Sequence, residues 1–105
     1  MTPVELPRGV KLEAGTRPQL AKRARLRLDR KTDQYVLLYP EKGLLLNATG
    51  AAIAKRCTGA LSVAEIVAEL GVEYPSQPQG DLEREVFAFL GMLAERGLLV
   101  ELEPA

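Results

Sequence analysis

The chain has 105 residues, of which 47% are hydrophobic and 27% charged, and its formal net charge is zero. These values are typical of one globular domain and exclude a deep catalytic cavity between two lobes. No apolar run reaches the roughly 18 residues of a membrane helix, and the start lacks the apolar core of a signal peptide. We therefore expect a cytoplasmic protein that does not contact a membrane.

The charges are unevenly distributed along the chain. Up to Lys31 there are nine Lys or Arg residues against three Asp or Glu, and beyond it five against eleven. Such asymmetry can mark a surface for nucleic acid or for an acidic peptide, or it can be a solvated strand and tail without a partner.

The sequence has few residues that could bind a metal ion or react as a thiol. Cys57 is the only cysteine and there is no histidine, so no internal disulfide can form and a metal would need other ligands. We expect no metal and no cofactor, and we interpret Cys57 as a small buried residue near a helix end.

Residues 1–16 are predicted to form a flexible arm, followed by a single domain over residues 17–105. The arm contains Pro3, Pro7, Gly9 and Gly15 and has no continuous apolar core, a composition typical of mobile termini. We expect little structure before about Arg17.

Three strands are predicted next, as an antiparallel meander. Residues 23–29 alternate between charged and apolar residues, with Ala24, Leu26 and Leu28 on one side and three arginines and Asp29 on the other. Residues 35–39 are apolar on both faces, as in a central strand. A turn through Pro40 and Gly43 then leads to a third strand over residues 44–46.

The first and third strands of this meander are its edges. Positive side chains flank the first strand, which discourages pairing with other chains, whereas the third, Leu44-Leu45-Leu46, carries neither charge nor proline. We predict that this third edge is left open so that an extended peptide can be added to it as a further strand. The same edge could also pair with a second copy in a homodimer.

Three helices are predicted after the strands. Asn47 is the expected N-cap of the first, which runs to about Cys57 and ends at Gly59. Residues 62–65 form a capping box for the second helix, which Gly71 should end. Asp81 is the expected cap of the third, which runs through residue 96.

Residues 98–102 could form a short final strand or an extended tail. Two consecutive short helices beside a β-hairpin indicate an α+β fold that is winged-helix-like, with a three-stranded antiparallel sheet packed on three helices.

The third helix carries more apolar side chains than one core-facing stripe requires. The stripe recurs at helical spacing and comprises Leu82, Val86, Phe89, Leu90 and Leu93. Phe87 lies off this stripe, with Gly91 and Ala94 nearby. Either the domain packs both flanks of its longest helix, or Phe87 lines a groove beside the third strand.

The sequence contains no catalytic constellation, so we do not expect an enzyme. Nucleophile elbows and Gly-rich phosphate loops are absent, and no carboxylate pair has neighbours that would separate the two pKa values. Glu83 and Glu85 are explained as acidic residues that stabilise a helix start.

Nucleic-acid binding is the rival function, since winged helices often place a helix in the major groove. The second and third helices, however, are rich in Glu and Asp, which phosphates repel. We therefore expect no nucleic-acid partner.

Several short segments form a combined signature. They are Leu37-Leu38-Tyr39-Pro40-Glu41, Leu46-Asn47-Ala48-Thr49-Gly50, Ile53, Cys57-Thr58-Gly59, Val63-Ala64-Glu65-Ile66, and Phe89-Leu90 before Gly97. Together they resemble the PqqD family, coenzyme PQQ synthesis protein D, over about Arg17 to Gly97. Gly50 stands where many members of that family have alanine, a change expected to soften the first helix without touching the groove.

The resemblance implies a peptide chaperone of pyrroloquinoline quinone (PQQ) biosynthesis, which binds the ribosomal precursor peptide and presents it to a radical SAM enzyme. The fold is then that of a recognition element that holds a leader peptide between the third strand and the third helix. Iron–sulfur clusters and S-adenosylmethionine would belong to the partner enzyme. A related recognition domain could serve another modified-peptide pathway, since fold alone does not fix function.

The resemblance also implies the residues of the peptide site. On the strand side these are Leu44, Leu45, Leu46 and Asn47, and on the helix side Phe87, Leu90, Gly91 and Ala94.

Overall fold

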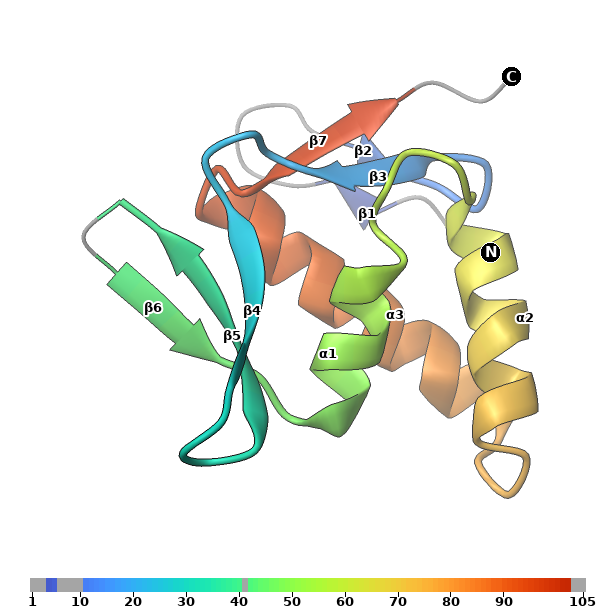
Figure 1. Ribbon diagram of the computed structural model, residues 1–105. Coiled ribbons are helices and arrows are strands. Elements are labelled where there is room, and N and C mark those ends of the chain that lie inside the picture. The colour runs from blue at the N-terminus through green and yellow to red at the C-terminus, as the bar shows by residue number, and fades with distance from the viewer. Residues whose placement is uncertain (1–3, 6–10, 41, 103–105) are drawn as a thin grey trace.

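The computed structural model describes residues 4–5, 11–40 and 42–102 (Figure 1). Their elements, in chain order, are β1 (Val4–Glu5), β2 (Lys11–Leu12), β3 (Arg17–Leu20), β4 (Arg25–Asp29), β5 (Gln34–Tyr39), β6 (Lys42–Leu45), α1 (Ala48–Lys55), α2 (Val63–Glu73), α3 (Gln79–Glu95) and β7 (Leu99–Leu102). The strands pair as β1–β2, β3–β7 and β4–β5–β6, and every pair is antiparallel. The predicted α+β class is confirmed.

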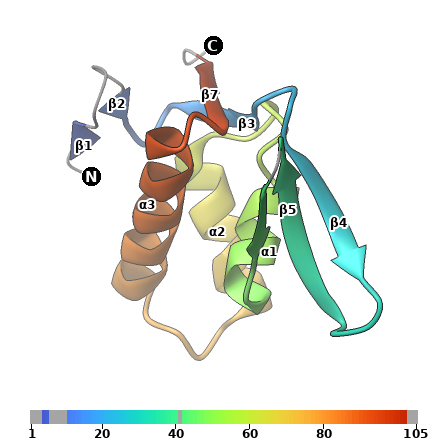
Figure 2. The same ribbon diagram turned by 90° about the vertical axis from the view of Figure 1, so that its left-hand side faces the viewer.

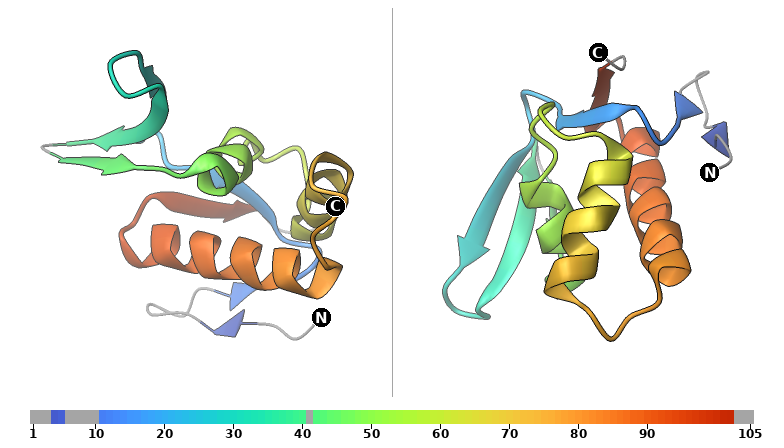
Figure 3. Two further views of the ribbon diagram at one scale, coloured as in Figure 1. Left: turned by 90° about the horizontal axis from the view of Figure 1, so that it is seen from below. Right: turned by 90° about the vertical axis from the view of Figure 1, so that its right-hand side faces the viewer.

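The sheet β4–β5–β6 is the predicted meander, except that β6 begins at Lys42, inside the predicted turn, and ends at Leu45, because Lys42 and Gly43 pair with Tyr39 and Leu38. Leu37 at its centre pairs with Leu26 of β4 and Leu44 of β6, and its side chain is fully buried. The helices lie on one side of this sheet, with α1 next to it and α3 farther away (Figures 2 and 3). Only the inner face of the sheet is therefore packed on the core. Glu41, in the predicted turn between β5 and β6, lies outside the described residues.

Leu28 differs from the expected pattern, because it belongs to the inner face but is 41% exposed. It pairs with Tyr35 toward the far end of the hairpin, so the helices do not cover it fully as they cover Leu37.

The starts of α1 and α2 agree with the predicted caps. The Asn47 Oδ1 atom accepts a hydrogen bond from the Gly50 backbone N–H at 2.7 Å. At α2 the Ser62 Oγ atom accepts from Glu65 N–H, and the Glu65 carboxylate accepts from Ser62 N–H. This backbone hydrogen bond lowers the pKa of Glu65. Gly59 has the predicted left-handed backbone, with φ of 85°, but it lies beyond the end of α1, whose last residue is Lys55 and whose C-cap is Arg56.

Two predicted helix boundaries are wrong. Gly71 does not end α2, which continues to Glu73, because glycine in a helix costs only about 1 kcal/mol and does not break it. Asp81 does not cap α3: the N-cap is Pro78, and Asp81 lies in the first turn, where its carboxylate pairs with Arg84.

The C-terminal segment forms a strand, the first of the two predicted alternatives. Strand β7 pairs with β3, which the sequence patterns did not indicate. The Gly59 N–H donates to the Pro18 carbonyl at 2.9 Å and the Leu20 N–H to the Cys57 carbonyl at 3.0 Å. Strand β3 thus connects β7 to the loop between α1 and α2.

Residues 12–16 differ from the flexible arm expected over residues 1–16. Leu12 is fully buried in the core. The Val63 N–H donates to the Thr16 carbonyl at 2.8 Å, and the Ala64 N–H donates to the Ala14 carbonyl at 3.0 Å. The packed part of the chain therefore begins before Arg17. Residues 1–3 and 6–10 of the predicted arm lie outside the described residues.

None of the helices in the described part of the chain has both the length and the apolar composition needed to cross a membrane.

Candidate functional site

The one thiol of the chain is part of the core. Cys57 is 3% exposed, and its Sγ donates to the Ile53 carbonyl at 3.3 Å. Burial raises the pKa of this thiol to about 12, so the nucleophilic thiolate is scarcely populated at neutral pH. The interpretation of Cys57 as a structural residue is confirmed. Within the described residues, no three or more His, Cys, Asp or Glu side chains lie together in an arrangement that could hold a metal ion.

Strand β6 is an edge of its sheet. Among the described residues it pairs with β5 alone. The Leu46 N–H donates to the Tyr35 carbonyl at 2.9 Å, which directs the backbone polar groups of Leu46 toward β5. Because these groups alternate in direction along an antiparallel strand, those of Gly43 and Leu45 point away from β5, toward the open edge.

The side chains of this strand alternate in burial. Leu44 is half-buried, Leu45 is 56% exposed and Leu46 is 4% exposed. Leu44 and Leu46 therefore anchor the strand to the core while Leu45 remains on the outer face. These two anchors hold β6 in position, and the backbone groups that point toward the open edge are left unburied.

A hollow of about 340 Å³ lies where β6 leads into α1, and residues of α3 form its other side. Its lining residues are Asn47, Thr49, Gly50, Ile53, Glu85, Ala88 and Phe89. A Cβ atom on Gly50 would lie 3.1 Å from Phe89 Cε1, so the missing side chain makes room for the phenyl ring. The expectation that Gly50 is remote from a groove is wrong.

The predicted helix residues are not all on the side of α3 that faces this hollow. Phe89 packs at Gly50, and at about 100° per residue Phe87 and Gly91 each lie about 200° around the helix from it. Leu90 is fully buried and Ala94 is 6% exposed, so both belong to the core. The structure thus brings Phe89 and Glu85 to the strand end, and leaves Phe87 and Gly91 on the opposite flank.

The sequence analysis did not include Gly43, Glu85 or Phe89 among the residues of the peptide site. Phe89 was assigned to the core stripe, but it is only half-buried. The signal that could have identified it is Gly50, a glycine inside a short helix, which marks close approach of another group.

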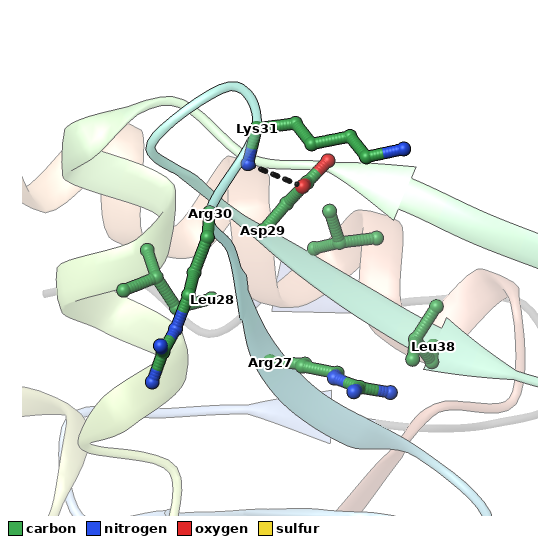
Figure 4. Close-up of a pocket in the computed structure, with 7 residues that line it drawn as sticks. Arg27, Leu28, Asp29, Arg30, Lys31 and Leu38 are labelled. Atoms are coloured by element: carbon green, nitrogen blue, oxygen red, sulfur yellow. Dashed lines mark hydrogen bonds between the residues drawn. The ribbon is translucent and has the colours of Figure 1, made fainter.

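A second hollow lies along β4, β5 and the turn between them, mainly on the outer face of the sheet, which no helix among the described residues covers. Its lining residues are Arg27, Leu28, Asp29, Arg30, Lys31, Val36 and Leu38. Figure 4 shows that the Lys31 N–H donates to Asp29 Oδ1, at 3.0 Å, in the turn that follows β4. The basic side chains around apolar Val36 and Leu38 make this face typical of a charged, solvated surface.

A third hollow lies beside α1, between β5 and the end of α2. Lys55 Nζ lies 4.1 Å from the ring centroid of Tyr35, and Arg56 contacts Glu69 at 2.9 Å and Glu73 at 3.4 Å. These cations are already paired within the fold. Burial is the main cause that raises the pKa of Tyr74, another lining residue.

The family model of coenzyme PQQ synthesis protein D (PqqD) matches residues 34–99. A PqqA binding protein of Rhodopseudomonas palustris strain TIE-1 is 35% identical over 95 residues, which are 90% of this chain and 92% of the relative. A PqqA binding protein of Xanthomonas oryzae pv. oryzae strain PXO99A is 35% identical over 82 residues, 78% and 88% of the two chains.

Solved structures share the fold. The solution structure of the PqqD truncation of Methylobacterium extorquens PqqCD, a functional and stand-alone RiPP recognition element, superposes with a TM-score of 0.68 at 30% identity, covering 79% of this chain and 87% of that one. TbiB1 in complex with the TbiA(beta) leader peptide has a TM-score of 0.66 at 26% identity, covering 77% and 93%. Family model, relatives and fold together establish that this chain belongs to the PqqD family.

Proposed function

We propose that this chain binds the PqqA precursor peptide of PQQ synthesis as an added strand on β6 and presents it to a radical SAM enzyme. Relatives at 35% identity are PqqA binding proteins, and TbiB1, which has a similar fold, was solved with a leader peptide. The proposed activity is peptide binding without catalysis.

The observation that carries the proposal is the free edge of β6. The outward backbone groups of Gly43 and Leu45 would pair with the main chain of the peptide, which gives affinity that is independent of peptide sequence. A bound strand would lie about 4.8 Å from β6 and would pass the hollow that Asn47 and Phe89 line.

Side chains around the edge have different roles in this mode of binding. Leu44, Leu46 and Asn47 hold the strand in place, while Leu45 contacts the outward side chains of the peptide. Phe89 lines the wall at the strand end, with Leu90 buried behind it. Phe87, Gly91 and Ala94 act through the packing of α3 and do not touch the peptide in this arrangement.

The precursor of another modified-peptide pathway is the second candidate ligand. TbiB1 and its leader peptide are the observation that favours it, because the backbone mode of binding fits any extended peptide. The ligand is then decided by side chains that contact the hollow and the outer face.

Presentation means that the peptide is held at one segment while the rest stays accessible. An edge strand contacts the peptide along one side only, so residues beyond the paired segment can enter the active site of another protein. Iron–sulfur clusters and S-adenosylmethionine would be held by that enzyme.

The first experiment is a backbone amide NMR titration of the full chain with PqqA. We expect saturable shifts at Gly43, Leu45 and Gly50, and at Phe89 of α3. The amides of Leu28 and Asp29, at the other edge, are the internal control and should not move. Shifts centred on β4, or no shifts at high peptide concentration, would contradict the proposal.

Competition experiments distinguish PqqA from the other candidate ligands and partners. Excess unrelated leader peptide should displace labelled PqqA weakly, and duplex DNA at low salt should not displace it. If β6 instead pairs with a second copy of the chain, sedimentation will give a dimer that dissociates as PqqA is added, because both would use the same edge.

The presentation step needs a separate test with the radical SAM enzyme. We expect modification of PqqA to be much slower without this chain and to be restored by adding it. Equal rates with and without the chain would contradict presentation while leaving peptide binding intact.

A further inference from the structure

The two ends of the β6 edge differ in charge. At its beginning, Tyr39 is the register partner of Lys42, and the Tyr39 Oη atom accepts a hydrogen bond from Arg96 Nη1 at 3.3 Å. This contact places the guanidinium at the C-terminus of α3 next to the start of β6. Both cations are exposed, so the described residues make this end of the edge positive.

The other end of the edge is negative. Glu85 lines the hollow at the end of β6, together with Asn47 and Phe89. Its Oε1 atom accepts a hydrogen bond from Gln77 Nε2 at 3.3 Å, and the group is exposed. No Lys or Arg is among the described residues that line this hollow, so the carboxylate has no cation beside it there.

Positions 85 and 96 lie on one side of α3. Eleven residues at about 100° each amount to three turns plus about 20°, so Glu85 and Arg96 project in nearly the same direction. That direction is the one that Phe89 takes toward Gly50. The helix therefore offers an acidic and a basic group, one at each end of the strand edge.

The length of the edge sets the spacing of the two charges. Five residue steps separate Lys42 from Asn47, which in a strand is about 17 Å at 3.3 to 3.4 Å per residue. This exceeds the Debye length of about 8 Å at physiological salt. Each end therefore acts on its own nearest peptide charge, and the two contributions add.

We propose that the edge selects peptides by the order of their charges: a basic residue first and an acidic residue about five positions later. The proposal rests on the function proposed above. Both strand pairs of the sheet are antiparallel, and an antiparallel peptide on β6 would begin at Asn47 and end at Lys42. Its basic residue would then face Glu85, and its acidic residue would face Lys42 and Arg96.

The test uses two synthetic 12-residue peptides with the same apolar residues at alternate positions. One carries lysine at position 3 and glutamate at position 8, and the other has these two residues exchanged. Exposed ion pairs contribute roughly 0.2 to 1 kcal/mol each, and reversal exchanges attraction for repulsion at both ends. We expect the base-first peptide to bind the full chain about tenfold more tightly at 50 mM salt, and the difference to shrink at 500 mM.

Matched double variants show which residues of α3 cause the preference for the base-first peptide. The exchange Glu85→Lys with Arg96→Glu should reverse the preference. The control exchange, Arg84→Glu with Glu95→Lys, has the same net charge but lies about 100° around α3 from that face, and it should keep the preference of the parent chain. Amide spectra show whether each variant is folded, and the milder Glu85→Gln and Arg96→Gln variants should each reduce the preference by about threefold.

A spin label on the peptide's first residue tests the direction of the strand. In the base-first peptide it should broaden the Asn47 and Gly50 amides and spare Gly43. Equal affinity for both peptides, or broadening at Gly43, would overturn this inference while edge binding stands. Failure of both synthetic peptides and of PqqA to shift the β6 amides would overturn the proposed function itself.

Discussion

The two edges of the β4–β5–β6 sheet expose similar side chains but differ in what surrounds them. Leu28 of β4 is 41% exposed and Leu45 of β6 is 56% exposed. Strand β4 flanks its leucines with Arg25 and Arg27, whereas β6 has no charge after Lys42. Exposed apolar area therefore does not distinguish the two edges. The charge pattern does, because charged side chains discourage pairing.

The two edges also lead into different structures. Strand β4 runs into a turn in which Asp33 has φ of 57°, and the neighbouring hollow is open and basic. Strand β6 runs into α1, where Asn47, Gly50 and Phe89 form a wall at the end of the strand. A peptide on β6 would meet a helix-lined surface, and a peptide on β4 would meet solvent.

Truncating Leu37, the central residue that supports both edges, should have the largest effect on stability. Leu37 pairs with Leu26 and Leu44 and is fully buried. Leu37→Ala should lower the free energy of unfolding by about 2 to 5 kcal/mol, measured by urea denaturation. The matched control Leu45→Ala, on the surface of the same sheet, should change it by less than about 0.5 kcal/mol. Equal losses would show that the sheet is not packed as described.

A lysine placed on each edge in turn tests which edge binds the peptide. Leu45→Lys should weaken PqqA binding about tenfold, or about 1.4 kcal/mol, because a charged edge discourages pairing. Leu28→Lys places the same charge on β4 and should change the affinity by less than about twofold. Fluorescence anisotropy with labelled PqqA measures both. An unchanged affinity in folded Leu45→Lys would move the site away from β6.

The cap that joins β6 to α1 should have a smaller effect on stability. Asn47→Ala removes the acceptor for Gly50 N–H and should lower the free energy of unfolding by about 1 kcal/mol. Asn47→Asp retains an acceptor and should recover most of this loss in the same denaturation experiment. If both variants lose equally, the cap is not what stabilises the start of α1.

Two glycine substitutions test the wall of the hollow and have the smallest expected effects. Gly71→Ala in α2 meets nothing within 4 Å of the new Cβ and should raise the free energy of unfolding by about 0.5 to 1 kcal/mol. Gly50→Ala gains the same helix propensity but meets Phe89 Cε1 at 3.1 Å, so its net gain should be smaller. Thermal unfolding compares the two, and a shift of the Phe89 ring protons should accompany Gly50→Ala alone. Equal gains would mean that the ring does not occupy this position.

Local patterns in the sequence were sufficient for the meander, for the capped starts of α1 and α2, and for the buried Cys57. Alternation, capping residues and turn glycines depend on neighbours within a few residues, which the sequence displays directly. The uncharged leucines of the third strand also identified β6, which among the described residues pairs with β5 alone.

Patterns of this kind failed where distant segments supply the partner. Strand β3 contains Pro18 and has no clear alternation, and it is a strand because β7, at the other end of the described chain, pairs with it. Leu12 was assigned to the flexible arm because its neighbours in the sequence do not indicate that it packs into the core, where it is fully buried. Glycine is a common residue at helix ends, so Gly71 was expected to end α2. The helix continues past it because the turns before it are packed on the core.

The sequence by itself determined the family, the order of the main elements and the edge strand whose leucines carry no charge among them, because each depends on residue types at fixed spacing. Only the tertiary structure decided which side of α3 faces that strand. Helical periodicity gives the angle between Phe87 and Phe89 but not the direction in which the helix is turned. The contact of Phe89 with Gly50 and that of Arg96 with Tyr39 fix that direction, and they place Glu85 and Arg96 at opposite ends of the edge.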